Sequence, residues 1–111
     1  MPFFVCRLNP PRPSFATDMS GEEAQAMADH VDFWQGHAER GIVVVFGPVL
    51  DPAGVWGLAV VEADRLEAVE ALTAADPAIR AGIGCRYDIL PMLTATARSG
   101  AAAAQEPGRP G

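Results

Sequence analysis

Apolar residues along the chain form short continuous runs that alternate with stretches of helical spacing. The run Pro2–Leu8 is typical of a β-strand, and the prolines after it predict a loop over residues 9–19. Ser20 and Glu23 have capping-box spacing, and apolar side chains then recur at steps of three and four, which predicts a helix ending at Gly41. Its apolar stripe comprises Met27, Val31, Trp34 and Ala38.

The next segment predicts a β-hairpin. Ile42–Phe46 is a continuous run of β-branched and aromatic residues, typical of a buried strand, and Gly47-Pro48 is expected to end it. Asp51–Gly54 has the composition of a turn, and Val55–Val61 that of a second strand. We therefore expect the two strands to pair with each other.

A second helix and a last strand complete the pattern. Asp64 and Glu67 again have capping-box spacing, so the helix is expected to begin there. Its apolar side comprises Leu66, Val69 and Leu72. Pro77 limits this helix because proline disfavours helical geometry at the preceding residue, and Gly82–Leu90 is the last predicted strand.

The order β-α-β-β-α-β is that of the ferredoxin-like unit, an α+β fold whose antiparallel four-stranded sheet carries two helices on one face. The other face would be bare, and stacking two copies would bury it. The sequence therefore predicts one domain over residues 1–93 that forms a homodimer. The Ala-, Gly- and Pro-rich residues 94–111 are expected to form a flexible tail.

The amino-acid composition limits the kinds of molecule that the chain is expected to bind. The formal net charge is −6 and the eight basic residues form no run, which argues against nucleic acid and against an anionic membrane surface. No stretch approaches a signal core or the ~20 apolar residues of a membrane helix. Two cysteines are too few for a disulfide scaffold, so the default expectation is a cytoplasmic location.

His30 is the first candidate for chemistry. It lies three residues after Met27 and four before Trp34, beside the apolar stripe of the first helix. A neutral imidazole there could act as general acid or base near pH 7. The alternative is a histidine that caps the edge of the core and bonds to a backbone group.

Asp76 is the second candidate. It precedes Pro77, and an Asp-Pro pair after a helix is often only a turn former. The functional alternative is a carboxylate that fixes the tautomer of a neighbouring histidine. Asp51, which precedes Pro52, has the same two interpretations, and its position favours the hairpin turn.

The remaining polar residues predict neither a metal site nor a cofactor. His37 lies two helical turns after His30, a rise of ~10 Å, which is too long for one shared metal ion. Cys6 and Cys85 fall on the first and last predicted strands, where packed thiols are favoured over a redox pair. Core filling is likewise favoured over ligand stacking for the large aromatic residues Trp34, Phe46 and Trp56.

Several of these features together resemble the YCII-related (YciI-like) family across residues 2–93. The matching features are His30, Gly41 ahead of Ile42–Phe46, Gly47-Pro48, and Asp76-Pro77 ahead of Ala81-Gly82-Ile83. The resemblance implies a dimeric α+β barrel of ferredoxin-like protomers with a cleft between helices and sheet. It also implies an active site built from a histidine and an aspartate, which fall on His30 and Asp76.

The resemblance also implies a range of chemistry. Architecturally similar proteins include muconolactone isomerases, and one branch of the family is linked to dehydrochlorination of chlorinated hydroxyquinols. The chain departs from the family pattern at Met27, where many relatives carry an arginine, so pairing with an anion would need Arg7 or Arg12. The loop 9–19 is also longer than is usual in the family, and it could cover the cleft as a lid.

The sequence is therefore compatible with two alternative functions. The first is a cofactor-free lyase or isomerase that acts on a small cyclic oxygenated metabolite, in which His30 moves a proton and Asp76 holds the imidazole. The second is a non-catalytic module that binds a small ligand or serves as a dimerising accessory to another protein. A redox role for Cys6 and Cys85 ranks last.

Overall fold

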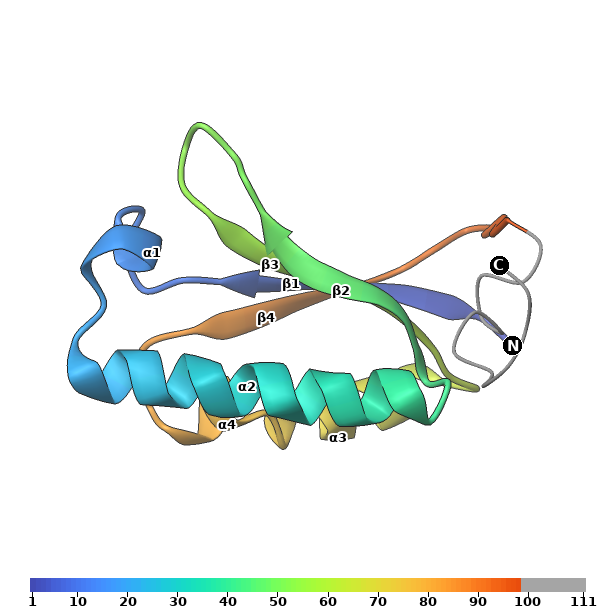
Figure 1. Cartoon of the computed structure of the whole chain (residues 1–111). Helices are drawn as coiled ribbons and strands as arrows, with labels where there is room; N and C mark the ends of the chain where they lie inside the picture. Colours follow the sequence, from blue (N-terminus) through green and yellow to red (C-terminus); the bar gives the residue numbers. More distant parts are fainter. Residues whose placement is uncertain (99–111) are drawn as a thin grey trace, which may run out of the picture.

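The computed structural model of the chain describes residues 1–98 and has an α+β fold (Figure 1). Its elements are β1 (Phe3–Asn9), α1 (Phe15–Asp18), α2 (Gly21–Glu39), β2 (Val43–Val49), β3 (Trp56–Glu62), α3 (Leu66–Ala74), α4 (Pro77–Arg80) and β4 (Arg86–Pro91). The four strands form one antiparallel sheet in the order β2-β3-β1-β4, with α2, α3 and α4 together on one side. The predicted ferredoxin-like fold is confirmed.

The core lies between the sheet and the two long helices. Along β1 every second residue is buried, and in the antiparallel register Phe4 faces Val61 while Cys6 faces Ala59. Because side chains alternate across a strand, these residues all point to the helical side. The buried cluster is completed by Trp34 from α2, Val43 from β2 and Val69 from α3.

Both ends of α2 form as the sequence predicts. The Ser20 hydroxyl accepts a hydrogen bond from the Glu23 amide at 3.1 Å, and the Glu23 carboxylate accepts one from the Ser20 amide at 2.8 Å. At the other end Gly41 has a φ of 78°, and the amides of Gly41 and Ile42 donate to the carbonyls of Ala38 and His37. This is a Schellman motif, which needs a residue with positive φ and thus favours glycine.

The apolar stripe of α2 serves two purposes. Trp34 is 1% exposed and lies in the core, and Ala38 packs against that cluster. Met27 and Val31 lie outside the core cluster and border a cavity that Trp34 also lines, and Val31 remains 50% exposed. The N-terminal half of the helix is therefore free to contact a ligand.

The prediction that Gly47-Pro48 ends β2 is wrong, since the strand continues to Val49. Pro48 stands opposite Gly57 of β3, and β2 is one of the two edge strands of the sheet. A proline is tolerated at an edge because its missing amide is not needed for a second neighbour.

Other boundaries also differ from the prediction. The segment 9–19, predicted as a loop, contains the one-turn helix α1. The helix α3 begins at Leu66, and its N-cap is Arg65, whose side chain makes no capping hydrogen bond. The predicted capping box at Asp64 therefore does not form. The last strand begins only at Arg86, because Gly82 and Gly84 adopt positive φ angles of 66° and 93° in the preceding turn.

Residues 99–111, the larger part of the predicted tail, lie outside the described residues. Within residues 1–98, none of the helices combines the length and apolarity needed to cross a bilayer.

Candidate functional site

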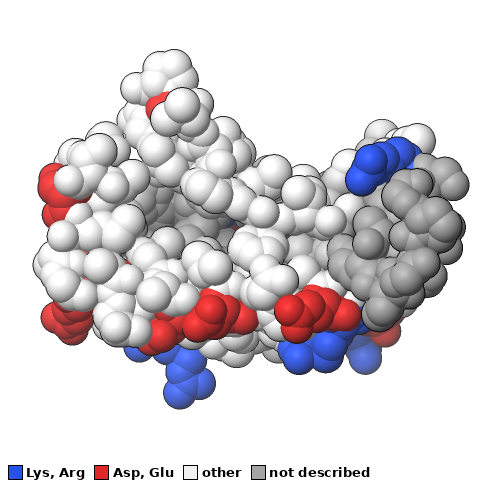
Figure 2. All heavy atoms as spheres, viewed as in Figure 1, with Lys and Arg blue, Asp and Glu red and all other residues white. Residues whose placement is uncertain are grey.

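A cavity of about 480 Å³ lies between α2 and the sheet. Its floor comes from β1, β3 and β4, and its sides come from α2, the segment 9–19 and the β2–β3 hairpin. Figure 2 shows the hollow at the surface, surrounded by uncharged residues, with acidic side chains along the edge below it. A volume of this size is in the range of small-molecule sites.

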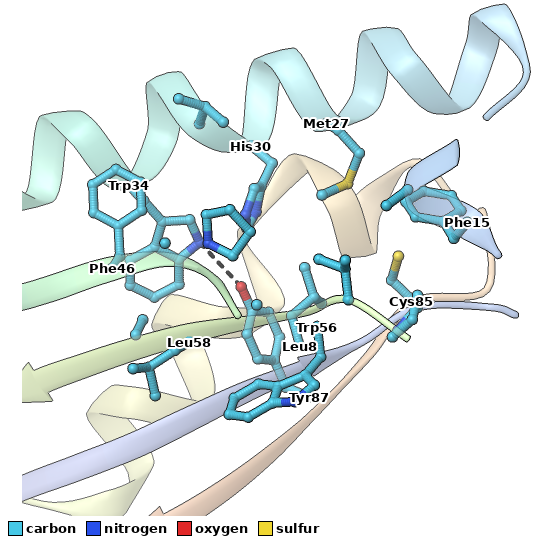
Figure 3. Close-up of a pocket in the computed structure, with 18 of the residues that line it drawn as sticks. Leu8, Phe15, Met27, His30, Trp34, Phe46, Trp56, Leu58, Cys85 and Tyr87 are labelled. Atoms are coloured by element: carbon cyan, nitrogen blue, oxygen red, sulfur yellow. Dashed lines mark hydrogen bonds between the residues drawn. The ribbon is translucent and has the colours of Figure 1, made fainter. Parts of the chain in front are cut away.

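His30 reaches this cavity from α2 and contacts Asp76 at the same time. Its Nδ1 lies 2.8 Å from Oδ2 and 3.0 Å from Oδ1 of Asp76, and its side chain is 13% exposed. Figure 3 shows His30 pointing from the helix toward the sheet, between Met27 and Trp34. The two residues that the sequence singles out are therefore in direct contact, although they are 46 positions apart in the chain.

Asp76 makes the contacts that each of its two proposed roles would need, those of a turn former and those with His30. It is the N-cap of α4, where its Oδ1 accepts a hydrogen bond from the Ala78 amide at 2.9 Å and Pro77 occupies the first helical turn. Its side chain is fully buried, and its Oδ2 also accepts hydrogen bonds from Trp34 Nε1 at 2.8 Å and from the Tyr87 hydroxyl. The turn fixes the carboxylate, and the carboxylate then fixes the imidazole.

The hydrogen bonds around Asp76 determine its charge. Burial raises the pKa of the Asp76 carboxyl. Hydrogen bonds from His30, Tyr87, Ala78 and Trp34 together lower the pKa by more than burial raises it, so that it lies below its usual range. Burial and the nearby Asp76 charge raise the pKa of Tyr87, so its hydroxyl stays protonated and donates. An ionised Asp76 accepts only, so Nδ1 of His30 carries the proton and a neutral imidazole has its lone pair at Nε2.

Trp34 and Tyr87 belong to the site as hydrogen-bond donors, and sequence reasoning missed this role. The sequence predicts Trp34 for the core and assigns no role to Tyr87. One signal was present: alternation along β4 places Tyr87 opposite Leu8 on the helical side of the sheet. A tyrosine buried there needs a partner for its hydroxyl.

The two arginines considered as partners for an anion do not line the cavity. Arg12 donates to both oxygens of Glu23 at 2.9 and 2.8 Å and to Asp18 at 2.9 Å. Arg7 donates to Asn9, and its guanidinium carbon lies 4.3 Å from the centre of the Trp56 ring. In this structure, therefore, neither Arg7 nor Arg12 supplies the positive charge that many relatives carry as an arginine at the position of Met27.

The segment 9–19 forms a wall of the cavity. Phe15 is buried and lines the cavity together with Met19. Arg12 ties this segment to Glu23 at the first turn of α2. The predicted lid is thus a packed wall that closes one end.

The cysteines occupy separate places. Cys6 is buried in β1, where burial raises its pKa to about 11, whereas Cys85 lines the cavity just before β4. Burial, and then the charges of Asp76 and Glu23, raise the Cys85 pKa as well. Cys6 stands opposite Ile89, four residues from Cys85, or ~13 Å along a strand. That is too far for a disulfide, so a redox pair is not supported.

The other two polar candidates, His37 and Asp51, contact neighbouring side chains and backbone groups outside the pair of His30 and Asp76. The Nδ1 atom of His37 lies 2.9 Å from the Arg40 guanidinium, and its ring packs edge-on against Phe33 at 4.6 Å. Asp51 accepts hydrogen bonds from the Ala53 amide at 2.8 Å and from Trp56 Nε1 at 3.1 Å, which agrees with its predicted role in the turn. Across residues 1–98, His, Cys, Asp and Glu side chains form no group of three placed to hold a metal ion.

The sequence model of one family, described as the YCII-related domain, matches residues 3–93. The matched range includes every element from β1 to β4 and therefore both His30 and Asp76. No curated protein is similar enough to the chain to count as a match.

Proposed function

The chain belongs to the YCII-related family, and on that premise we propose that it is a cofactor-free lyase or isomerase acting on a small cyclic oxygenated metabolite. One observation carries the proposal: the imidazole of His30 borders the cavity while its Nδ1 lies 2.8 Å from the buried Asp76 carboxylate. An imidazole held in this way presents Nε2 to a ligand as a proton acceptor.

The proposed reaction is a proton transfer next to a carbonyl or enol. Nε2 of His30 takes the hydroxyl proton of an enol, which leaves an enolate. In an isomerase the imidazolium returns this proton to the carbon end of the enolate. In a lyase the enolate electron pair expels a leaving group from the neighbouring carbon, and the imidazolium passes its proton to that group. Asp76 stabilises the imidazolium that forms in between.

The proposed partner is a second copy of the chain. Val45, Val60, Val5 and Leu90 stand side by side across β2, β3, β1 and β4. They lie on the face opposite the core, and Val45 and Leu90 are 52% and 58% exposed. Two such faces packed together would bury this apolar row and form the barrel that the fold allows.

A second candidate function is a non-catalytic module that binds a small ligand. The observation that favours it is the chemistry of the cavity wall, which offers His30 but no charged side chain to stabilise a developing oxyanion. In this reading the contact between His30 and Asp76 orients the imidazole for ligand binding alone.

Turnover separates the two functions. A thermal-shift screen against ring-cleavage and quinol metabolites would identify ligands, and wild type, His30→Gln and His30→Ala would then be assayed with each. The enzyme account expects kcat to fall by about 10²–10⁴ in both variants. Turnover unchanged in both would refute the mechanism, and binding without turnover by the wild type would favour the module.

A further inference from the structure

The wall of the cavity around His30 is uncharged. The other residues of α2 that line the cavity are Met27, Val31 and Trp34, and β2 contributes Phe46, Gly47 and Pro48. Of all the described residues that line the cavity, none is an Asp, Glu, Lys or Arg. Hydrophobic and aromatic side chains thus provide most of the contact area for a ligand.

Cations close to the cavity are already engaged. Arg12 is held by two hydrogen bonds to Glu23 and two to Asp18, and Arg7 lies over the ring of Trp56. The described residues therefore supply no arginine that can pair with an anion inside the cavity. The formal net charge of the chain, −6, further disfavours an anionic ligand.

The contact of His30 with Asp76 offers no free positive charge either. If the imidazole becomes protonated, the Asp76 carboxylate at 2.8 Å balances its charge, so that the pair is neutral as a whole. When the imidazole is neutral, Nδ1 donates to Asp76 and Nε2 can only accept a hydrogen bond. A ligand group that matches Nε2 is therefore a hydroxyl donor.

We infer that the cavity selects an uncharged ring compound that presents a hydroxyl group to Nε2 of His30, and that it rejects carboxylates. This inference rests on the proposed function for the position of the reacting group and specifies the substrate class. A phenol or an enol has the required donor and an apolar body. A carboxylate would have to lose its water in a cavity without a cation, which is strongly unfavourable.

Two probes with the same ring system test this selectivity. Binding of 2-naphthol and 2-naphthoate to the wild-type protein would be measured at pH 7 by titration calorimetry. We expect 2-naphthol to bind at least about 30-fold more tightly than 2-naphthoate, because only the latter carries an unpaired charge into the cavity. Met27→Arg places a cation one turn from His30 and should reduce this ratio at least about tenfold.

Ala28→Arg is the matched control. It adds the same charge at the next position of α2, where the side chain is exposed and does not line the cavity, so the wild-type ratio should persist. Equal or tighter binding of 2-naphthoate by the wild type would overturn the inference, and so would the absence of saturable binding of 2-naphthol. Neither result would alter the effect of His30→Gln on turnover, so failure of the inference is distinguishable from failure of the proposed function.

Discussion

The indole Nε1 of Trp34 lies 3.0 Å from the hydroxyl oxygen of Tyr87, and both groups donate to the same carboxylate oxygen of Asp76. These residues come from α2, β4 and the N-cap of α4, so the carboxylate connects three elements. Since Asp76 is fully buried, its donors both hold its position and maintain its charge. The geometry of His30 thus depends on Tyr87 and α4 as well as on its own helix.

Tyr87→Phe tests this connection. The variant keeps the ring but removes a donor to Asp76 and an acceptor for Trp34 Nε1, so the free energy of unfolding should fall by about 1–2 kcal/mol. Urea unfolding of wild type and variant measures the difference. Unchanged stability would mean that the hydroxyl makes no net contribution to the network.

The Asp76 charge predicts a specific dependence of stability on pH. Its pKa is lower in the folded chain than its usual value of about 3.9, so the ionised carboxylate contributes stability that is fully present above pH 4. This contribution is lost as the pH falls through the folded-state pKa. Asp76→Asn should therefore lower the free energy of unfolding by about 2–4 kcal/mol at pH 7 and by less below pH 4.

Urea unfolding of wild type and Asp76→Asn between pH 2.5 and 7 provides the comparison. Glu23, Asp18 and Asp51 also have lowered pKa values, but they titrate in both proteins and cancel in the difference. A difference that is constant over the whole range would contradict an ionised Asp76 in the folded state.

Gly54 is predicted to hold the wall of the cavity in place. Its φ is 134°, and a Cβ at this position would lie 2.8 Å from the carbonyl oxygen of Pro13. Gly54→Ala should therefore destabilise the fold by about 1–3 kcal/mol and move the segment 9–19 away from the hairpin. Gly47→Ala is the control, because nothing lies within 4 Å of its Cβ position.

Urea unfolding gives the stability of both glycine variants, and tryptophan fluorescence reports on the cavity, since Trp34 and Trp56 both line it. Equal effects of Gly54→Ala and Gly47→Ala would argue against a close contact between the hairpin and Pro13.

The exposed apolar row on the face of the sheet opposite the helices predicts that the protein forms a homodimer. Leu90→Lys places a charge in the apolar row and should weaken a homodimer at least about 100-fold, because the charge would be buried without a partner. Leu93→Lys is the control, since Leu93 is 99% exposed beyond the end of β4. Sedimentation velocity measures both variants, and a wild-type protein that remains monomeric at high concentration would refute the proposed dimer.

The sequence predicted the fold well because the fold depends on local signals. Alternation and apolar runs located all four strands, and the caps at Ser20 and Gly41 fixed the ends of the long helix. The errors arose where tertiary position decides: Pro48 is accepted in β2 because the strand lies at the sheet edge, and α1 forms around the buried side chain of Phe15.

The candidate site could be predicted only in part. Helix position, turn chemistry and family resemblance point to His30 and Asp76, and the structure brings them into contact. The partner of the Tyr87 hydroxyl and the pairing of Arg12 with Glu23 could not be predicted, because both depend on which side chains meet across elements distant in the chain.

The tautomer of His30 tests the central claim most directly. Long-range ¹H–¹⁵N correlation spectra, recorded at a pH where the ring is neutral, distinguish a proton at Nδ1 from one at Nε2, and His37 serves as the internal reference. The contact with Asp76 predicts that His30 carries its proton at Nδ1 and that this preference is lost in Asp76→Asn. A proton at Nε2 in the wild type, or an unchanged preference in the variant, would contradict an imidazole held by Asp76 for proton transfer.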